Sequence, residues 1–412
     1  MNFLYTLLLR AALPVILARL WWRGRREPGY RQFVAERFGR HDGKAPARLI
    51  WIHAVSVGEA RAASPLVNAL RAALPDHAVL LTCTTAAGRA TLEQIYGNSV
   101  QISYLPYDFP EAAQNFLQHF RPRLGILMET EVWPNLVGAC LKNAVPVLLA
   151  NARMSEKSAR SYARWKPIMA PAFASLSAVC AQSDADAQRL RALGARHVEV
   201  SGNLKFDAEL DAGQLAGGRA WRERVARPVL LLASTREGEE KLLIDALPPW
   251  DGKLLVVVVP RHPQRFDEVA QWTQSRRTRE ALPGSADHLH LGDTMGEMGF
   301  YFAACDVAVI GGSFLPLGGQ NLIEALAAGA PVVAGPNMHN FTEATRLALA
   351  AGAAIQAAGA AEAIRLALGL LESAGKRHAM SEAGKALCAQ HRGATARHLE
   401  ICRRLLRAGA PG

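Results

Sequence analysis

The sequence has few cysteines for its length, six in 412 residues, and these six lie far apart in the chain. This spacing excludes a disulfide-rich scaffold, a zinc ribbon and a thioredoxin-type pair, and it indicates reduced, cytosolic thiols. The HExxH, GxSxG and P-loop motifs are also absent. The cysteines are Cys83, Cys140, Cys180, Cys305, Cys388 and Cys402.

Acidic residues are fewer than basic ones, with 36 Asp and Glu against 47 Lys and Arg. The net charge is +11, and the pI is about 9.6. Such a chain favours anionic partners: nucleic acid, phosphorylated small molecules or an anionic lipid surface. Composition does not choose between them. Half of the residues are apolar and a fifth are charged, which excludes a disordered, collagen-like or coiled-coil protein. The length suggests two domains, or three at most.

The N-terminal segment 1–24 is predicted to be a membrane-anchor helix, because residues 2–22 are largely apolar and long enough to span a bilayer. Its arginines follow the apolar run, the reverse of a cleavable signal peptide, and place the body of the protein on the cytoplasmic side. Arg10 would cost roughly 2.5–3.5 kcal/mol inside a bilayer, so a helix lying in the interface is the alternative.

Short apolar strands alternate with helical segments along most of the chain. The segment 48–60 contains a strand and a turn, a helix is expected at 64–74, and the next strand lies at 77–85. A charged, Gly-rich stretch at 207–218 interrupts the alternation, which then resumes. This pattern predicts two doubly wound α/β halves with parallel sheets, joined by a linker, with ligands bound at the carboxyl ends of the strands.

Four strand-end loops of the second half are rich in polar residues and glycine, at 233–240, 256–266, 291–298 and 305–336. In the last of these, glycines precede a helix that carries Asn321 and Glu324. Glycines let a backbone approach a phosphate, and a helix start attracts negative charge. Any one of these loops could be an ordinary helix cap, but together they favour a nucleotide site.

Two strand ends of the first half carry carboxylates: Glu59 after one strand, Glu129 and Glu131 after another. One acid could deprotonate a substrate hydroxyl while another stabilises positive charge, although an acid in this position is more often a helix-start residue. Lys205 lies near the junction of the halves. It could meet a leaving phosphate or be solvated.

Two possible metal motifs are better explained in other ways. Asp184 and Asp186 form a D-x-D pattern, but they follow Ser183 at an expected helix start, where acids are common. His288 and His290 alternate on a strand without neighbouring Cys or carboxylate ligands.

Taken together, the motifs resemble those of the bacterial 3-deoxy-D-manno-octulosonic acid (Kdo) transferases over nearly the whole chain. The sequence has Ala54 where the family pattern has serine. The motifs are LYTLLLR…RLWWRGRREPGYR, HAVSVGEA, YLPYD, LMETEVWPNL, NARMSEKSARSY, SGNLKFD, VPRHPQRF, GDTMGEM, GGSF and GGQNLIEA.

The resemblance implies an inverting, metal-independent glycosyltransferase of the GT-B type. Its N-terminal Rossmann-like domain (25–206) would bind the acceptor, and its C-terminal domain (219–412) would bind CMP-Kdo, with terminal helices packing back toward the first. Glu59 would be the general base, with Glu129 and Lys205 as the charge-stabilising pair. The implied CMP contacts are Pro260, Arg261, Met295, Gly296, Glu297, Asn321, Leu322, Ile323 and Glu324.

The implied reaction transfers Kdo from CMP-Kdo to the 6′-hydroxyl of the tetraacyl lipid A precursor in lipopolysaccharide biosynthesis, at the cytoplasmic face of the inner membrane. No cofactor and no nucleic acid partner are expected. A GT-B enzyme for a UDP-sugar, either transferase or epimerase, is the alternative. A non-catalytic basic protein bound to nucleic acid or anionic lipid is a weaker one.

Overall fold

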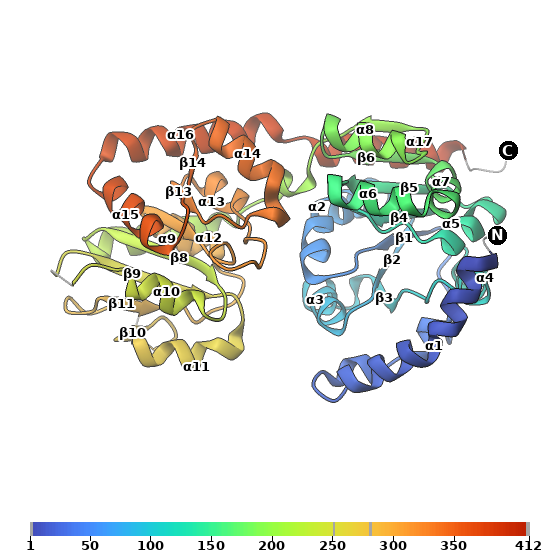
Figure 1. The fold of residues 1–412 in the computed structure, drawn as a ribbon, viewed down its shortest axis with the longest axis horizontal. Coiled ribbons are helices and arrows are strands. Elements are labelled where there is room, and N and C mark those ends of the chain that lie inside the picture. Colours follow the sequence, from blue (N-terminus) through green and yellow to red (C-terminus); the bar gives the residue numbers. More distant parts are fainter. Residues whose placement is uncertain (1–2, 250–251, 280–281, 409–412) are drawn as a thin grey trace. The chain divides into compact units, whose positions relative to one another are not determined.

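The computed structural model describes residues 3–249, 252–279 and 282–408 and contains two compact α/β units (Figure 1). The first unit is made of two segments of the chain, one that ends at Ala208 and one that begins at Arg392. The second unit comprises Glu209–His391. Each has a seven-stranded parallel sheet, which confirms the predicted fold class. Residues 1–2 of the predicted anchor and residues 250–251, 280–281 and 409–412 of the predicted second domain lie outside the described residues.

The first sheet has the strand order β3-β2-β1-β4-β5-β6-β7, so β1 and β4, which lie far apart in the sequence, are neighbours. His53 at the end of β1 pairs with Leu127 near the end of β4. The strands are β1 (Leu49–His53), β2 (Ala78–Cys83), β3 (Gln101–Tyr104), β4 (Leu124–Met128), β5 (Val147–Ala152), β6 (Ala178–Ala181) and β7 (Val198–Val200).

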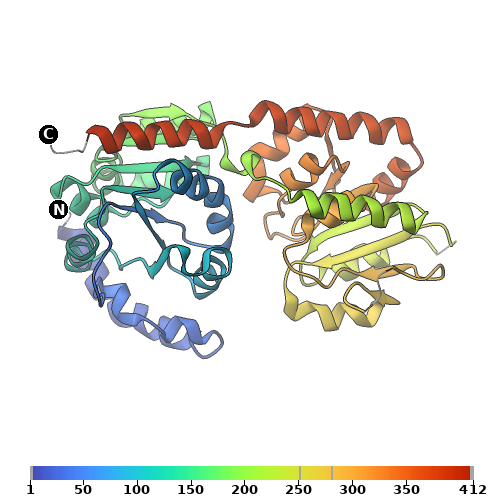
Figure 2. The same cartoon turned by 180° about the vertical axis from the view of Figure 1, so that it is seen from behind.

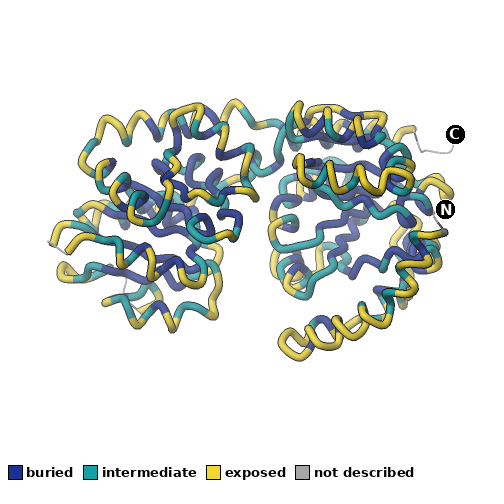
Figure 3. The backbone as a smooth tube through the Cα atoms, viewed as in Figure 1, coloured by how far each residue is buried: buried dark blue, intermediate teal, exposed yellow. Residues whose placement is uncertain are grey.

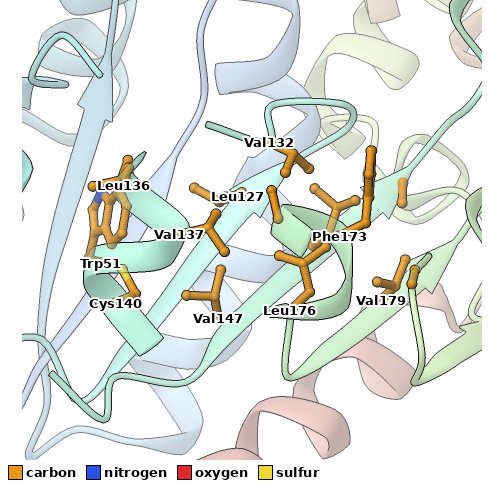
Figure 4. Packing of buried hydrophobic residues seen from close by; sticks show 14 of the residues in the cluster. Trp51, Leu127, Val132, Leu136, Val137, Cys140, Val147, Phe173, Leu176 and Val179 are labelled. Carbon is orange, nitrogen blue, oxygen red and sulfur yellow. The ribbon is translucent and has the colours of Figure 1, made fainter. Parts of the chain in front are cut away.

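Helices cover both faces of this sheet, because alternate residues of its strands point to opposite sides. In β1, Leu49 and Trp51 enter one core cluster (Figure 4) and Ile50 and Ile52 the other. The first cluster is closed by α4 (Pro110–Phe120), α5 (Pro134–Lys142), α7 (Lys166–Ala174) and α8 (Asp184–Ala192), and the second by α2 (Val57–Ala73), α3 (Ala86–Tyr96) and α17 (Ala394–Ala408). Apart from the N-terminal helix, the remaining helices of this unit are α6 (Glu156–Arg164) and the 3-10 turns η1 (Pro28–Arg31), η2 (Val34–Phe38), η3 (Gly97–Ser99) and η4 (Leu204–Asp207).

The last helix, α17, packs on the first unit, where Ile401 and Cys402 are buried in its core beside α2 (Figure 2). The sequence-based boundaries assign this helix to the second domain. Helix α2 begins at Val57 rather than near Ser64, with Pro65 inside it, so Glu59 lies in its first turn.

The second sheet has the order β10-β11-β9-β8-β12-β13-β14. Its strands are β8 (Val229–Thr235), β9 (Leu255–Pro260), β10 (Ser275–Arg276), β11 (Leu289–Leu291), β12 (Val307–Ile310), β13 (Val332–Ala334) and β14 (Ala354–Gln356). Its helices are α9 (Ala212–Val225), α10 (Glu239–Asp245), α11 (Phe266–Val269), α12 (Met298–Ala303), α13 (Ile323–Ala328), α14 (Thr342–Ala350), α15 (Ala360–Leu371) and α16 (Ala374–His391), with the 3-10 turns η5 (Pro263–Arg265), η6 (Ala270–Trp272) and η7 (His339–Phe341).

The stretch 207–218, predicted to be a linker, is partly helical. Asp211 caps α9 by accepting the backbone N–H of Gln214 at 2.7 Å. Gly218 packs so closely on α12 that a Cβ there would lie 2.3 Å from the carbonyl oxygen of Phe300. Gly218 is therefore required for the close packing of α9 on α12, rather than for a flexible linker.

Helix α1 (Phe3–Arg23) is long and apolar enough to cross a membrane, and only a small part of it is buried (Figure 3). Its first turns are nevertheless tied to the first unit. The Tyr5 hydroxyl donates to Oδ2 of Asp108 at 2.9 Å, Thr6 and Asn135 exchange hydrogen bonds, and Arg10 pairs with Glu111.

Candidate active site

The carboxylates predicted from the first half meet at the carboxyl ends of β1 and β4. Glu59 lies in the first turn of α2, and its Oε2 accepts the backbone N–H of Val55 at 2.8 Å. Glu129 follows β4 in a left-handed conformation (φ 56°) and donates its backbone N–H to the carbonyl oxygen of Ala150 at 2.9 Å. A left-handed backbone is uncommon for a residue with a side chain and often marks a functional site.

Lys205 completes this cluster. Its Nζ lies 3.4 Å from Oε1 of Glu129, and both side chains are largely buried, with exposures of 19% and 16%. A pair shielded from water interacts more strongly than one on the surface. The first unit thus brings together all three predicted catalytic residues: Glu59, Glu129 and Lys205.

The environment of Glu59 makes it a stronger base than an ordinary glutamate. The pKa of Glu59 is raised to about 8, chiefly by burial, then by the charge of Glu129 and more weakly by that of Glu131, while the Val55 N–H and Lys205 oppose the shift. Burial also raises the pKa of Glu131 to about 7. Carboxyl groups with pKa values near neutrality are suited to proton transfer.

A hydrogen-bonded chain from the C-terminal helix supports the backbone next to Lys205. Nε2 of buried His398 accepts the N–H of Asn151 at 3.0 Å. Oδ1 of Asn151, a residue with a φ of 51°, accepts the N–H of Leu204 at 3.0 Å. Burial lowers the pKa of His398 to about 4, so the ring is neutral, and Nδ1–H donates to the carbonyl oxygen of Ala394 at 2.7 Å. No sequence motif signals this contact.

The 3-10 turn η4, which contains Lys205, also caps the start of α17. The Asp207 carboxylate accepts the backbone N–H of Gly393 at 2.7 Å and that of Thr395. Arg397 of α17 donates to the carbonyl oxygen of Ser201 at 3.0 Å. The position of Lys205 therefore depends on a helix from the other end of the chain.

The predicted donor-binding loops gather at one edge of the second sheet, where β9, β8 and β12 are adjacent and parallel. Pro260 ends β9, and the backbone N–H of Arg261 donates to the carbonyl oxygen of Thr235 at 2.8 Å. The pKa of His262 is lowered, first by burial and then by the charges of Arg236 and Arg261. Two arginines, Arg236 and Arg261, therefore lie close together at this edge, where they could attract a phosphate.

Glu239 organises the glycine-bearing loop after β12. Its buried carboxylate accepts four backbone N–H groups, from Arg236 at 3.0 Å, Gly312 at 2.5 Å, Phe314 at 2.8 Å and Leu315 at 3.4 Å. The sequence contains this acid in ASTREGEE, where it is indistinguishable from a common helix-start residue.

The predicted contacts at 321–324 form the start of α13. Nδ2 of Asn321 donates to Oε1 of Glu324 at 2.8 Å, and Oδ1 of Asn321 accepts the N–H of Ile323 at 3.1 Å. The side chains of Leu322 and Ile323 are buried in the core, so a ligand would meet their backbone. The polar side chains at this helix start are therefore those of Asn321 and Glu324, an amide and a carboxylate that suit hydroxyl groups.

The remaining predicted contacts, Met295 to Glu297, follow β11. Met295 is exposed, and Gly296 has a φ of 80°. The Glu297 carboxylate accepts Nε–H of Arg277 at 2.9 Å and the Thr294 hydroxyl at 2.7 Å. The bond from Arg277 is the main cause of the lowered pKa of Glu297.

The aspartates of the D-x-D pattern lie at the start of α8. Oδ1 of Asp186 accepts the N–H of Met154 at 2.7 Å, and Ser183 accepts the N–H of Asp186 at 3.2 Å. Within the described ranges, no group of three or more His, Cys, Asp or Glu side chains is arranged to hold a metal ion.

Comparison with known proteins identifies close relatives. The family model described as 3-deoxy-D-manno-octulosonic-acid transferase (kdotransferase) matches residues 32–208. The 3-deoxy-D-manno-octulosonic acid transferase of Bordetella pertussis is 47% identical over 96% of this chain and 97% of its own. Its counterpart in Haemophilus influenzae is 33% identical, covering 97% of both chains.

Among solved structures, Anabaena HepE in complex with UDP superposes with a TM-score of 0.59 at 16% identity, covering 87% of this chain and 99% of its own. At this identity the likeness concerns the fold alone. The expected GT-B-type architecture is confirmed.

Proposed function

The chain belongs to the 3-deoxy-D-manno-octulosonic acid transferases, and we propose that it transfers Kdo from CMP-Kdo to the 6′-hydroxyl of the tetraacyl lipid A precursor. Its glycosyltransferase class follows from its close relatives. The observation that carries the finer proposal is the cluster of Glu59, Glu129 and Lys205 at one sheet edge, with a pKa of about 8 for Glu59.

In the proposed reaction, the Glu59 carboxylate removes the proton of the acceptor hydroxyl while the hydroxyl oxygen attacks the anomeric carbon of Kdo. The bond from that carbon to the phosphate oxygen of CMP breaks, and CMP leaves with the bonding electrons. Attack opposite the leaving group inverts the anomeric configuration. Glu129 stabilises the positive charge that develops on the sugar, and Lys205 offsets the negative charge of CMP.

The donor would bind at the edge of the second sheet where Arg236 and Arg261 lie. Arg261 would meet the phosphate together with the backbone of the glycine-bearing loop held by Glu239. Asn321 and Glu324 present an amide and a carboxylate, which suit ribose hydroxyls. Since arginine, lysine and backbone N–H groups can neutralise the phosphate, we propose that catalysis needs neither a metal nor another cofactor.

We further propose that α1 attaches the protein to the cytoplasmic face of the inner membrane by lying in the interface. Tyr5 and Thr6 at its start bond to Asp108 and Asn135 of the folded body, which a spanning helix could not do without leaving the bilayer. Its large exposed apolar residues are Leu4, Leu7, Leu8, Val15, Leu17, Trp21 and Trp22. Arginines stack on the two tryptophans, where lipid phosphates would lie.

Mass spectrometry of the lipid product tests this function. The protein is incubated with the tetraacyl precursor and CMP-Kdo generated in place. A gain of one or more Kdo units is expected, and their number gives the count of transfers. If the lipid mass does not change and UDP stabilises the folded protein while CMP does not, the proposal is wrong and a UDP-sugar enzyme takes its place.

A further inference from the structure

A strongly basic cavity lies in the first unit, at the amino ends of the strands. It has a volume of about 370 Å³ and is lined by Arg48, His77, Arg123, Arg403 and Arg407, together with two leucines. The candidate catalytic acids follow β1 and β4 at the carboxyl ends, whereas Arg48 and Arg123 precede the same two strands. A strand of five residues separates the two edges by roughly 16 Å, so the cavity is distinct from the candidate active site.

The charges around this cavity are poorly compensated. In the described part of the chain, the side chains of Arg123, Arg403 and Arg407 have no hydrogen-bond or ion-pair partner, although the first two residues are half-buried. Arg48 approaches only Asp76, at 4.0 Å, and the Asp76 side chain is 80% exposed. Guanidinium groups that converge without acids repel one another, and a bound anion relieves this repulsion.

The charges of these arginines also act on His77, which lines the cavity. The pKa of His77 is lowered, first by burial and then by the charges of Arg48 and Arg123, with Asp76 in opposition. Nδ1 of His77 is also buried without a hydrogen-bond partner among the described residues.

We propose that this cavity is a binding site for a phosphate-bearing anion. Guanidinium groups bind phosphate oxygens through paired N–H donors, which favours phosphate over a monovalent ion. The arginines come from three separate places in the chain: the approach to β1, the approach to β4 and the last turns of α17. The site therefore forms only in the folded unit. The phosphate comes either from a soluble compound or from a lipid headgroup.

Binding of inorganic pyrophosphate to the full chain tests the site, with CMP present at saturation so that phosphate sites for the donor are filled. The double variant R123Q/R403Q is compared by calorimetry, at constant ionic strength, with R164Q/R196Q, which removes the same charge from two exposed, unpartnered arginines of the same unit. The cavity variant should bind pyrophosphate at least about tenfold more weakly than the control. If it does not fold, R48Q/R407Q, which alters two exposed side chains, replaces it.

Sedimentation with vesicles of phosphatidylcholine, with and without phosphatidylglycerol, separates the two sources. If the cavity variant binds more weakly than the control to vesicles that contain phosphatidylglycerol, but equally well to vesicles without it, the phosphate is that of a lipid headgroup. A loss of pyrophosphate affinity with unchanged vesicle binding identifies a soluble phosphate compound. If the cavity variant matches the control in both experiments, the proposal is overturned.

Discussion

Asn151 donates its backbone N–H to Nε2 of His398 at 3.0 Å, across 247 positions of sequence. Through its side chain, Asn151 also holds the N–H of Leu204, the residue before Lys205. The C-terminal helix is thereby part of the framework that sets the distance between Lys205 and Glu129 in the same unit.

This framework predicts that Asn151 acts as a positioning residue. Both Asn151→Ala and Asn151→Gly remove the acceptor for Leu204 N–H, so each should lower kcat roughly 10- to 100-fold by misplacing Lys205. Both variants leave the Leu204 N–H unpaired and should lose thermal stability, and the loss should be larger for alanine, because glycine tolerates the left-handed backbone and alanine does not. Equal kcat for Asn151→Gly and the wild type would mean that the bond does not position Lys205.

The raised pKa of Glu59 predicts the pH dependence of the reaction. A general base acts in its deprotonated form, so kcat/KM should rise with pH and level off above a pKa near 8. The measurement is kcat/KM for the acceptor, determined with the wild-type enzyme at limiting acceptor concentrations over a range of pH. A profile already flat above pH 6 would show that Glu59 does not limit the rate as a base.

The same shift makes a prediction about stability. Because the pKa of Glu59 is raised from 4.5 to about 8 in the folded protein, the native state holds a proton that the unfolded state releases between these values. The resulting contribution to stability is complete below pH 4.5 and is lost as the pH rises through 8. Glu59→Gln should therefore melt at a higher temperature than the wild type at pH 9, with a smaller difference at pH 6.

Glu239 should matter for donor binding in the second unit. Glu239→Ala leaves four buried or half-buried N–H groups unpaired and should destabilise that unit by about 3 kcal/mol or more. It should also raise KM for CMP-Kdo, because the glycine-bearing loop loses its support. Glu237→Ala, at an exposed neighbour, is the matched control and should change neither quantity. An unchanged KM for CMP-Kdo in a folded Glu239→Ala variant would show that this loop does not contribute to donor binding.

The contacts of α1 predict membrane topology. Since Tyr5 and Thr6 bond to the folded body, the N-terminus should lie on the same side of the membrane as that body. A cysteine introduced at position 2 would react with a membrane-impermeant reagent in inside-out vesicles and would be protected in right-side-out vesicles. The opposite labelling pattern would demonstrate a spanning helix.

Much of the fold and part of the site could be predicted from the sequence. The strands are apolar throughout because they are covered on both faces, and Glu59, Glu129 and Arg261 are conspicuous because they follow such strands. The sequence predicts the start of α2 near Ser64, whereas the helix begins at Val57 and has Pro65 inside it. The contacts of His398 and Glu239 could not be predicted, because they depend on tertiary pairing that no local pattern encodes.

The central claim is that Glu59 is the general base of Kdo transfer to the lipid acceptor. Its most direct test is the rate of Kdo-lipid formation, followed by mass spectrometry, for the wild type and Glu59→Gln at pH 8, with CMP binding and melting temperature measured in parallel. We expect a loss of roughly 10²- to 10⁴-fold in kcat, with CMP affinity unchanged and the fold intact. A Glu59→Gln variant that forms product at the wild-type rate would contradict it.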